Sequence, residues 1–251
     1  MTAFEVLCAA GAVWIATTLQ SAVGFGMGLV AIPLIVAAGR TLPEAVAIQL
    51  GASALQTGLA TYRERAQVPW RSGLFIAAVQ WLFVPLGVWG MLQLDRTGPE
   101  HVNQAVGASV MAALLTRLAV HPAAHHSVPR SWGIAAGATG GLLAGLVGMG
   151  GPPLVLYAMA HDWDERRFRA FLWSQFLMAW PPVVIAMVFL QGTRILGFVG
   201  LGFALAPVVW LGIRAGGLLS SRWKIATLHR AAHALLVLIA VRGLLGPWLS
   251  R

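Results

Sequence analysis

Two glycine-rich segments interrupt long apolar stretches, one in each half of the chain. The sequence GFGMG occupies residues 24–28, and GMGGPP occupies residues 148–153, about 124 residues later. A membrane interior holds no water to bond the backbone groups that such a break frees, so breaks persist only where they are buried in protein or line a cavity. Paired breaks at corresponding positions of two halves predict a transport site near the bilayer midplane.

The composition predicts an integral membrane protein. Hydrophobic residues make up 58% of the chain, charged residues make up 10%, and the mean hydropathy is +0.77. The 251 residues have room for eight to ten helices that span or half-span a bilayer. The formal net charge of +9 does not indicate a nucleic-acid partner, because the Lys and Arg residues lie in short loops between apolar runs. We therefore expect an all-α protein whose surroundings are the lipid bilayer.

The apolar stretches predict two halves of equal design. They lie at about 4–38, 43–62, 70–92 and 101–120, and then at about 131–160, 168–190, 195–220 and 229–248. The first and fifth stretches exceed one crossing and contain the breaks, so each is expected to form two shorter helices. Five segments per half predict two repeats inserted in opposite orientations. We expect an N-terminal repeat at residues 1–122, a cytoplasmic linker at 123–130 and a C-terminal repeat at 131–251.

The basic residues predict the orientation of the chain. With the loop after residue 62 in the cytoplasm, eleven Lys and Arg residues face the cytoplasm and five face the periplasm, as the positive-inside rule requires. Both termini are then periplasmic. Each broken stretch must begin and end on one side, as either a re-entrant pair of half-helices or two short crossings. The cytoplasmic set is Arg63, Arg65, Arg71, Arg117, Arg130, Arg166, Arg167, Arg169, Arg222, Lys224 and Arg230; the periplasmic set is Arg40, Arg96, Arg194, Arg242 and Arg251.

The glycines of the second half predict both close helix packing and a ligand site. Gly133 to Gly145 recur every four residues, which favours close approach of a neighbouring helix. At the break, Pro152 and Pro153 suit the first turn of a new helix, and the preceding glycines tolerate positive φ and a ligand close to the backbone. Backbone N–H groups and the positive end of a helix dipole would then form an anion site without a charged side chain.

Two glutamines follow the breaks at similar positions. Gln49 and Gln175 lie about 126 residues apart, and each either contacts the ligand or bonds another helix. Arg214 lies within an apolar stretch, where it either belongs to the anion path or extends to the cytoplasmic interface. Weaker candidates of the same polar kind are Gln20, Ser21, Ser53, Gln56, Tyr157 and Ser174.

Several function classes lack support in the sequence. All eight carboxylates lie at segment ends or in loops, so we expect an anion and not a cation as substrate. Because Pro122 and Pro129 interrupt a helix, we expect His121, His125 and His126 to lie in a loop. Their spacing therefore does not predict a metal site. His233 stands alone in an apolar helix, and no cluster indicates an enzyme, so we predict no catalytic residue, metal or cofactor.

The motifs resemble those of the TauE/SafE sulfite exporter family. They are QSAVGFG at residues 20–26 with Pro33, GLVGMGGP at 145–152 with Tyr157, and Pro207 with Gly212 and Gly216. The resemblance spans essentially the whole chain, although the first break lacks the GGPP string of the second. It implies transport of sulfite, a sulfonate or a related sulfur-containing anion across a bacterial inner membrane. A passive anion channel and a transporter of other organic anions stay open, as does a homo-oligomer.

The predicted site combines the breaks with the polar residues around them. We expect the anion to bind between the two breaks, with Arg214 as a further candidate for its path. The predicted substrate-binding residues are Gln20, Ser21, Gly24, Gly26, Gly28, Gln49, Gly148, Gly150, Gly151, Pro152, Tyr157 and Gln175.

Overall fold

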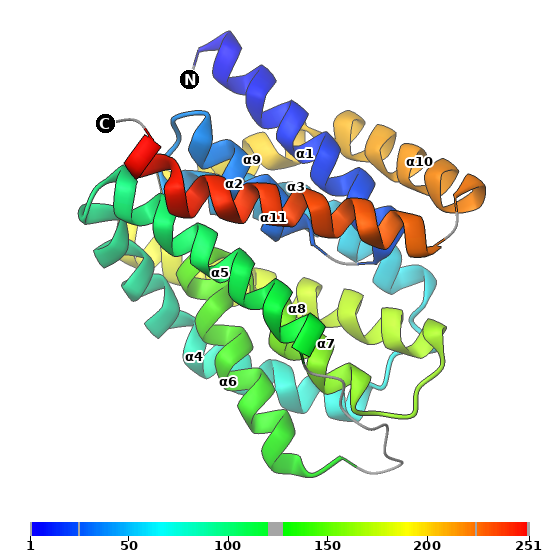
Figure 1. Cartoon of the computed structure of the whole chain (residues 1–251). Coiled ribbons are helices and arrows are strands. Elements are labelled where there is room, and N and C mark those ends of the chain that lie inside the picture. The colour runs from blue at the N-terminus through cyan, green and yellow to red at the C-terminus, as the bar shows by residue number, and fades with distance from the viewer. Residues whose placement is uncertain (1, 25, 120–127, 224, 250–251) are drawn as a thin grey trace.

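The protein is a bundle of helices (Figure 1). The structure, a computed structural model, describes residues 2–24, 26–119, 128–223 and 225–249, and every regular element within them is an α-helix. The helices are α1 (Ala3–Val23), α2 (Met27–Ala37), α3 (Leu42–Arg63), α4 (Trp70–Arg96), α5 (Pro99–Ala119), α6 (Arg130–Val147), α7 (Gly151–Met159), α8 (Glu165–Gln191), α9 (Ile195–Ala204), α10 (Ala206–Arg222) and α11 (Ile225–Leu249).

The first broken stretch forms α1 and α2. Gly24 ends α1 with φ 93° and Gly26 precedes α2 with φ 106°, a conformation that favours glycine. After α2 the chain returns to where α1 began, because Arg40 forms an ion pair with Glu5. This stretch therefore begins and ends at one end of the bundle, as the sequence predicts.

The second broken stretch repeats this arrangement in α6 and α7. Gly148 ends α6 with φ 68°. The ends of α1 and α6 are 124 residues apart, and so are the starts of α2 and α7. Val128, before α6, and Trp163, after α7, pack on the same hydrophobic cluster, so this stretch too begins and ends at one end. Each stretch consists of one long helix, of 21 or 18 residues, and one short helix, of 11 or 9 residues. Neither stretch forms two helices of equal length.

The helices of the two halves interleave. α4 packs along α6, α1 packs along α10, α3 contacts α9, and α8 contacts α4. A Cβ at Gly141 would lie 2.5 Å from the carbonyl oxygen of Gln80, and one at Gly145 would lie 2.4 Å from that of Val84. The glycine row of α6 therefore serves close packing against α4, one of its two predicted roles. Added side chains would separate the two helices.

The broken stretches hold α3 and α8 in opposite directions. α3 starts beside the α1 terminus through Arg40, and its far end at Arg63 lines the same hollow as Glu165, where α8 starts. The start of α1 and the end of α11 lie at one end of the molecule (Figure 1). The predicted domain boundary at 122, residues 123–127 of the linker, and His121, His125 and His126 lie outside the described residues.

The helices include several that suit a membrane. Among the described residues, α1, α4 and α8 are each long and apolar enough to cross one, and α9 with α10 would make a fourth span, bent by 50°. Large hydrophobic side chains such as Leu82 and Phe189 face outward, as expected of a lipid-facing surface. The membrane and all-α predictions are confirmed, whereas eight to ten crossings stay a prediction.

Candidate functional site

The two breaks line one cavity. It has a volume of about 110 Å³, enough for several water-sized molecules, and α1 to α8 and α11 all contribute to its wall. The predicted site residues in this lining are Gln20, Gly26, Gly28, Gln49, Gly148, Gly150, Gly151 and Pro152. The predicted residues outside it are Ser21, Gly24, Tyr157, Gln175 and Arg214.

Glycine lets the breaks approach each other. A Cβ at Gly28 would lie 2.7 Å from the carbonyl oxygen of Gly148, so the two breaks touch through their backbones. A Cβ at Gly150 would lie 2.5 Å from the carbonyl oxygen of Gly140 in α6. A Cβ at Gly151 would meet only the ring of Phe176, at 3.4 Å. Of the two neighbouring glycines, Gly150 is therefore closely packed and Gly151 borders free space.

The backbone donors belong mainly to the first break. The first three N–H groups of a helix have no acceptor within that helix. In α2 these are the groups of Met27, Gly28 and Leu29, all of which line the cavity. In α7 two of the three positions are Pro152 and Pro153, which have no N–H. The second break, at which the sequence predicts an anion site, therefore offers fewer backbone donors than the first, because its prolines leave only one of the three.

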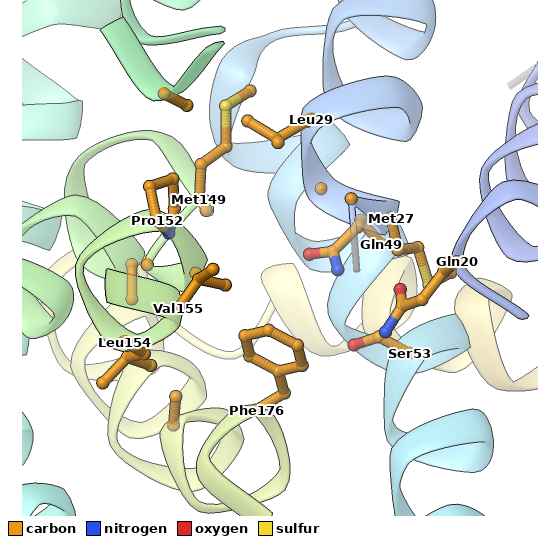
Figure 2. A pocket seen from close by; sticks show the side chains of 18 of the residues that line it. Gln20, Met27, Leu29, Gln49, Ser53, Met149, Pro152, Leu154, Val155 and Phe176 are labelled. Atoms are coloured by element: carbon orange, nitrogen blue, oxygen red, sulfur yellow. The ribbon is translucent and has the colours of Figure 1, made fainter. Parts of the chain in front are cut away.

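Three buried glutamines contribute polar groups to the lining. Gln20 of α1, Gln49 of α3 and Gln80 of α4 are 2%, 6% and 1% exposed, and the Oε1 atom of each lacks a hydrogen bond among the described residues. In Figure 2, Gln20 and Gln49 lie across the cavity from Val155 and Phe176. Buried amide groups normally find a partner, so these side chains have bonding capacity for a solute in the cavity.

Gln175 lies behind this wall. Its Oε1 accepts a hydrogen bond of 2.9 Å from Gln80 Nε2, and its Nε2 donates one of 3.1 Å to the carbonyl oxygen of Gly73. Gln175 is fully buried and holds Gln80 in place. Sequence comparison of the halves missed Gln80, although it is the one amide between residues 74 and 91.

The other predicted residues lie elsewhere. Ser21 accepts a 2.8 Å hydrogen bond from Gln56 Nε2. Tyr157 packs in an aromatic cluster whose other members are His161, Trp163 and Phe171. Arg214 is exposed, and its guanidinium lies 4.5 Å from the ring centre of Trp210 on the same helix. Arg214 therefore does not face the cavity, and its extension to the cytoplasmic interface stays a prediction.

In the part of the lining that the structure describes there is no Asp, Glu, Lys or Arg, and His233 of α11 is the titratable side chain. Among the described residues, no group of three or more His, Cys, Asp or Glu could hold a metal ion. The cavity can therefore bind through backbone N–H groups, amides and small hydroxyls, with an apolar wall opposite them.

A family comparison covers this whole arrangement. The family model "Sulfite exporter TauE/SafE" matches residues 8–243, which include both breaks and every lining residue of the cavity. The chain belongs to the TauE/SafE family. TauE/SafE proteins are membrane transporters, which agrees with the apolar helices found here. Comparison with curated proteins and with solved structures gave no match.

Proposed function

We propose that this TauE/SafE protein carries a small sulfur-containing anion, sulfite or a sulfonate, across the bacterial inner membrane through the cavity between the two breaks. One observation carries the proposal. The cavity joins the unpaired backbone N–H groups at the start of α2 and residues of the second break with buried glutamine amides, and its described lining carries no acidic side chain. A bound anion would meet donors and no negative charge.

The two walls suit the two parts of such a substrate. On one side, the N-terminus of α2 offers backbone N–H groups and the positive end of a helix dipole, and the amides of Gln20, Gln49 and Gln80 lie nearby. On the other side, Val155 and Phe176 offer apolar contact (Figure 2). Oxygens would bind the first wall, and the organic group of a sulfonate would pack on the second.

We also propose that residues 1–122 and 131–251 are inverted repeats. The 124-residue spacing of both break boundaries supports this. The packing supports it too, because α4 of the first half lies on α6 of the second, just as α10 of the second half lies on α1 of the first. The opposite directions of α3 and α8 support it as well. Inverted repeats give a transporter two related arrangements that open the site to alternate sides.

Flux into reconstituted vesicles tests the proposal. We expect saturable uptake and counterflow for at least one of sulfite, thiosulfate, taurine or sulfoacetate, with sulfate as a comparison anion. Flux without saturation or counterflow would instead identify a passive anion channel. Preference for carboxylates would favour another organic anion, and preference for cations would refute the anion site.

A further inference from the structure

A second, larger hollow lies at one end of the bundle. Its volume is about 500 Å³, and α1, α3, α8 and α10 form its wall. Unlike the cavity, it is lined by charged side chains. They are Arg63 and Glu64 at the end of α3, and Glu165, Arg166 and Arg169 at the start of α8.

The charges of this hollow favour anions. Arg169 and Glu165 form an ion pair of 3.7 Å, and Glu165 is largely exposed. Arg63 and Arg166 have no carboxylate within ion-pair distance among the described residues. Three guanidinium groups therefore face two carboxylates, and two of the three are not neutralised by a direct partner. A concave surface with this excess raises the local concentration of anions.

The hollow and the cavity are neighbours along α3. Ser53 and Thr57 line the cavity, whereas Gln56 and Ala60 line the hollow. Residues 53 and 57 lie one turn apart, and 56 and 60 continue along an adjacent face. The two spaces therefore border adjacent faces of the same segment of α3.

The first break also connects the two spaces. Gly26 lines the cavity, while a Cβ at Gly24 would lie 3.9 Å from Arg169 Nε, and Arg169 lines the hollow. Arg169 thus lies beside the backbone that leads into α2, whose N-terminus borders the cavity.

A hydrogen bond joins α1 and α3 where the two spaces are neighbours. Gln56 Nε2 donates to Ser21 Oγ at 2.8 Å across α3 and α1, and both residues line the hollow. The neighbouring Gln20 lines the cavity. The Oε1 atoms of Gln20 and Gln56 are buried without partners among the described residues, so neither amide oxygen holds this layer together.

We propose that the charged hollow is the access vestibule of the transport site, that Arg63, Arg166 and Arg169 gather small oxyanions there, and that the Ser21–Gln56 pair is its gate. This proposal rests on the proposed function. In this proposal the anion passes these arginines and not Arg214. Arg214 does not line the vestibule, although Ile213 and Gly217 of the same helix do. The positive-inside rule makes this the cytoplasmic entrance.

Cysteine labelling tests the vestibule without requiring transport. In a Cys8→Ala background, Ala60→Cys places a thiol in the vestibule, and Thr97→Cys places an exposed control thiol at the loop between α4 and α5. Purified protein is treated with a negatively charged and a positively charged methanethiosulfonate reagent of similar size. We expect the rate ratio of negative to positive reagent to be roughly tenfold higher at Ala60→Cys than at Thr97→Cys, and to fall as salt rises.

Removal of the arginine charges supplies the second arm. The double change Arg63→Gln and Arg166→Gln should lower the ratio of negative to positive labelling rates at Ala60→Cys to that of the control. The ratio at Thr97→Cys should not change. An Ala60→Cys ratio equal to the control, or one that survives this change, overturns the vestibule. Vesicle flux of the wild-type protein is measured alongside. A protein that shows the labelling preference but moves no anion would refute the proposed function and leave the anion-gathering vestibule standing.

The gate has its own test. Ser53→Cys places a thiol in the cavity, on the far side of the Ser21–Gln56 pair. We expect the negatively charged reagent to react more slowly there than at Ala60→Cys, and Ser21→Ala to accelerate the reaction at Ser53→Cys alone. A folded Ser21→Ala variant, checked by size-exclusion chromatography, with unchanged labelling at Ser53→Cys would refute the gate.

Discussion

The buried glutamines divide into two kinds according to their hydrogen bonds. Gln49 borders the cavity, and its Oε1 has no partner among the described residues, whereas both ends of the Gln175 amide bond other parts of the bundle. An amide with spare bonding capacity can bind a solute without losing a bond in the folded protein. An amide that is fully used stabilises the packing of its helices instead.

Leucine at these two positions should therefore give different defects. We expect Gln49→Leu to raise the apparent substrate constant roughly 5- to 150-fold at normal expression, since a lost hydrogen bond to a charged group costs about 1–3 kcal/mol. Gln175→Leu leaves the Nε2 group of Gln80 without its acceptor and removes the bond to the Gly73 carbonyl oxygen, and it should lower the free energy of unfolding by about 1–3 kcal/mol. Vesicle uptake measures the binding defect expected of Gln49→Leu, and thermal unfolding measures the stability defect expected of Gln175→Leu. An unchanged constant in Gln49→Leu would remove this glutamine from the site.

Alanine at the two glycines of the second break should also act differently. Gly151→Ala adds a methyl group that meets only Phe176 beside the cavity, so we expect folded protein with reduced transport. Gly150→Ala places its methyl group against the Gly140 carbonyl, where overpacking typically costs about 1–3 kcal/mol. The yield of monodisperse protein and the uptake rate are the measurements. Equal loss of folded protein in both variants would show that Gly151 is purely structural.

At the scale of the helices, the proline pair in α8 requires help from α4. Pro182 cannot donate to the carbonyl oxygen of Met178, and the indole Nε1 of Trp81 donates to that oxygen at 2.9 Å. Trp81 is partly exposed on a surface that we assign to lipid, where no water replaces a lost donor. The bond thus fixes α8 against α4 near Phe176 and Val183, which line the cavity.

Loss of this bond should be measurable as stability. We expect Trp81→Phe to lower the free energy of unfolding by about 1–3 kcal/mol, the cost of leaving a buried acceptor unpaired. Trp89→Phe is a matched control, because Trp89 is a similarly exposed tryptophan of α4. Thermal unfolding in the same detergent measures both. A Trp81→Phe protein no less stable than Trp89→Phe would contradict this role.

The packing of His161, in the loop between α7 and α8, should contribute to stability in a way that depends on pH. Burial lowers the pKa of His161, and the charge of Arg167 lowers it further, although the hydrogen bond to the Tyr157 carbonyl oxygen opposes them. The His161 ring stacks on Trp163 with centroids 4.2 Å apart. The native state therefore binds a proton at lower pH than the unfolded chain does.

The sign of the pH dependence follows from this difference. Above about pH 6.5, the ordinary pKa of histidine, both states are neutral at His161 and the stability does not change. As the pH falls below that value towards the lowered native pKa, the unfolded chain takes up the proton first and the stability decreases. We expect the unfolding temperature to fall between about pH 7 and 5, and His161→Phe to reduce the decrease. The same decrease in both proteins would assign it to other groups.

At the scale of the whole molecule, the proposed repeats have a definite topology. Thr2 and Thr97 should face the periplasm, and Ala66, in the loop after α3, should face the cytoplasm. Single cysteines at these positions in a Cys8→Ala background can be labelled in intact cells with an impermeant reagent. We expect reaction at positions 2 and 97 and protection at 66. Reaction at positions 2 and 66 from the same side would refute the inverted arrangement.

The sequence alone determined the features that depend on local chemistry. The apolar composition predicted a membrane protein, and the glycine-rich segments 24–28 and 148–153 predicted both breaks within a residue or two. The motifs around these breaks predicted the TauE/SafE family, which the family model confirmed. These features are legible because a break, a proline or a glycine row acts through its own backbone or its nearest neighbours.

Only the tertiary structure decided which polar residues face the cavity. Gln80 rather than Gln175 lines it, and Arg214 is exposed and absent from its lining. A helix that meets lipid on one side and apolar protein on the other shows little contrast between its faces, so the sequence does not state which face is which. That assignment depends on how helices distant in the chain pack together, and the interleaving of the two halves settled it.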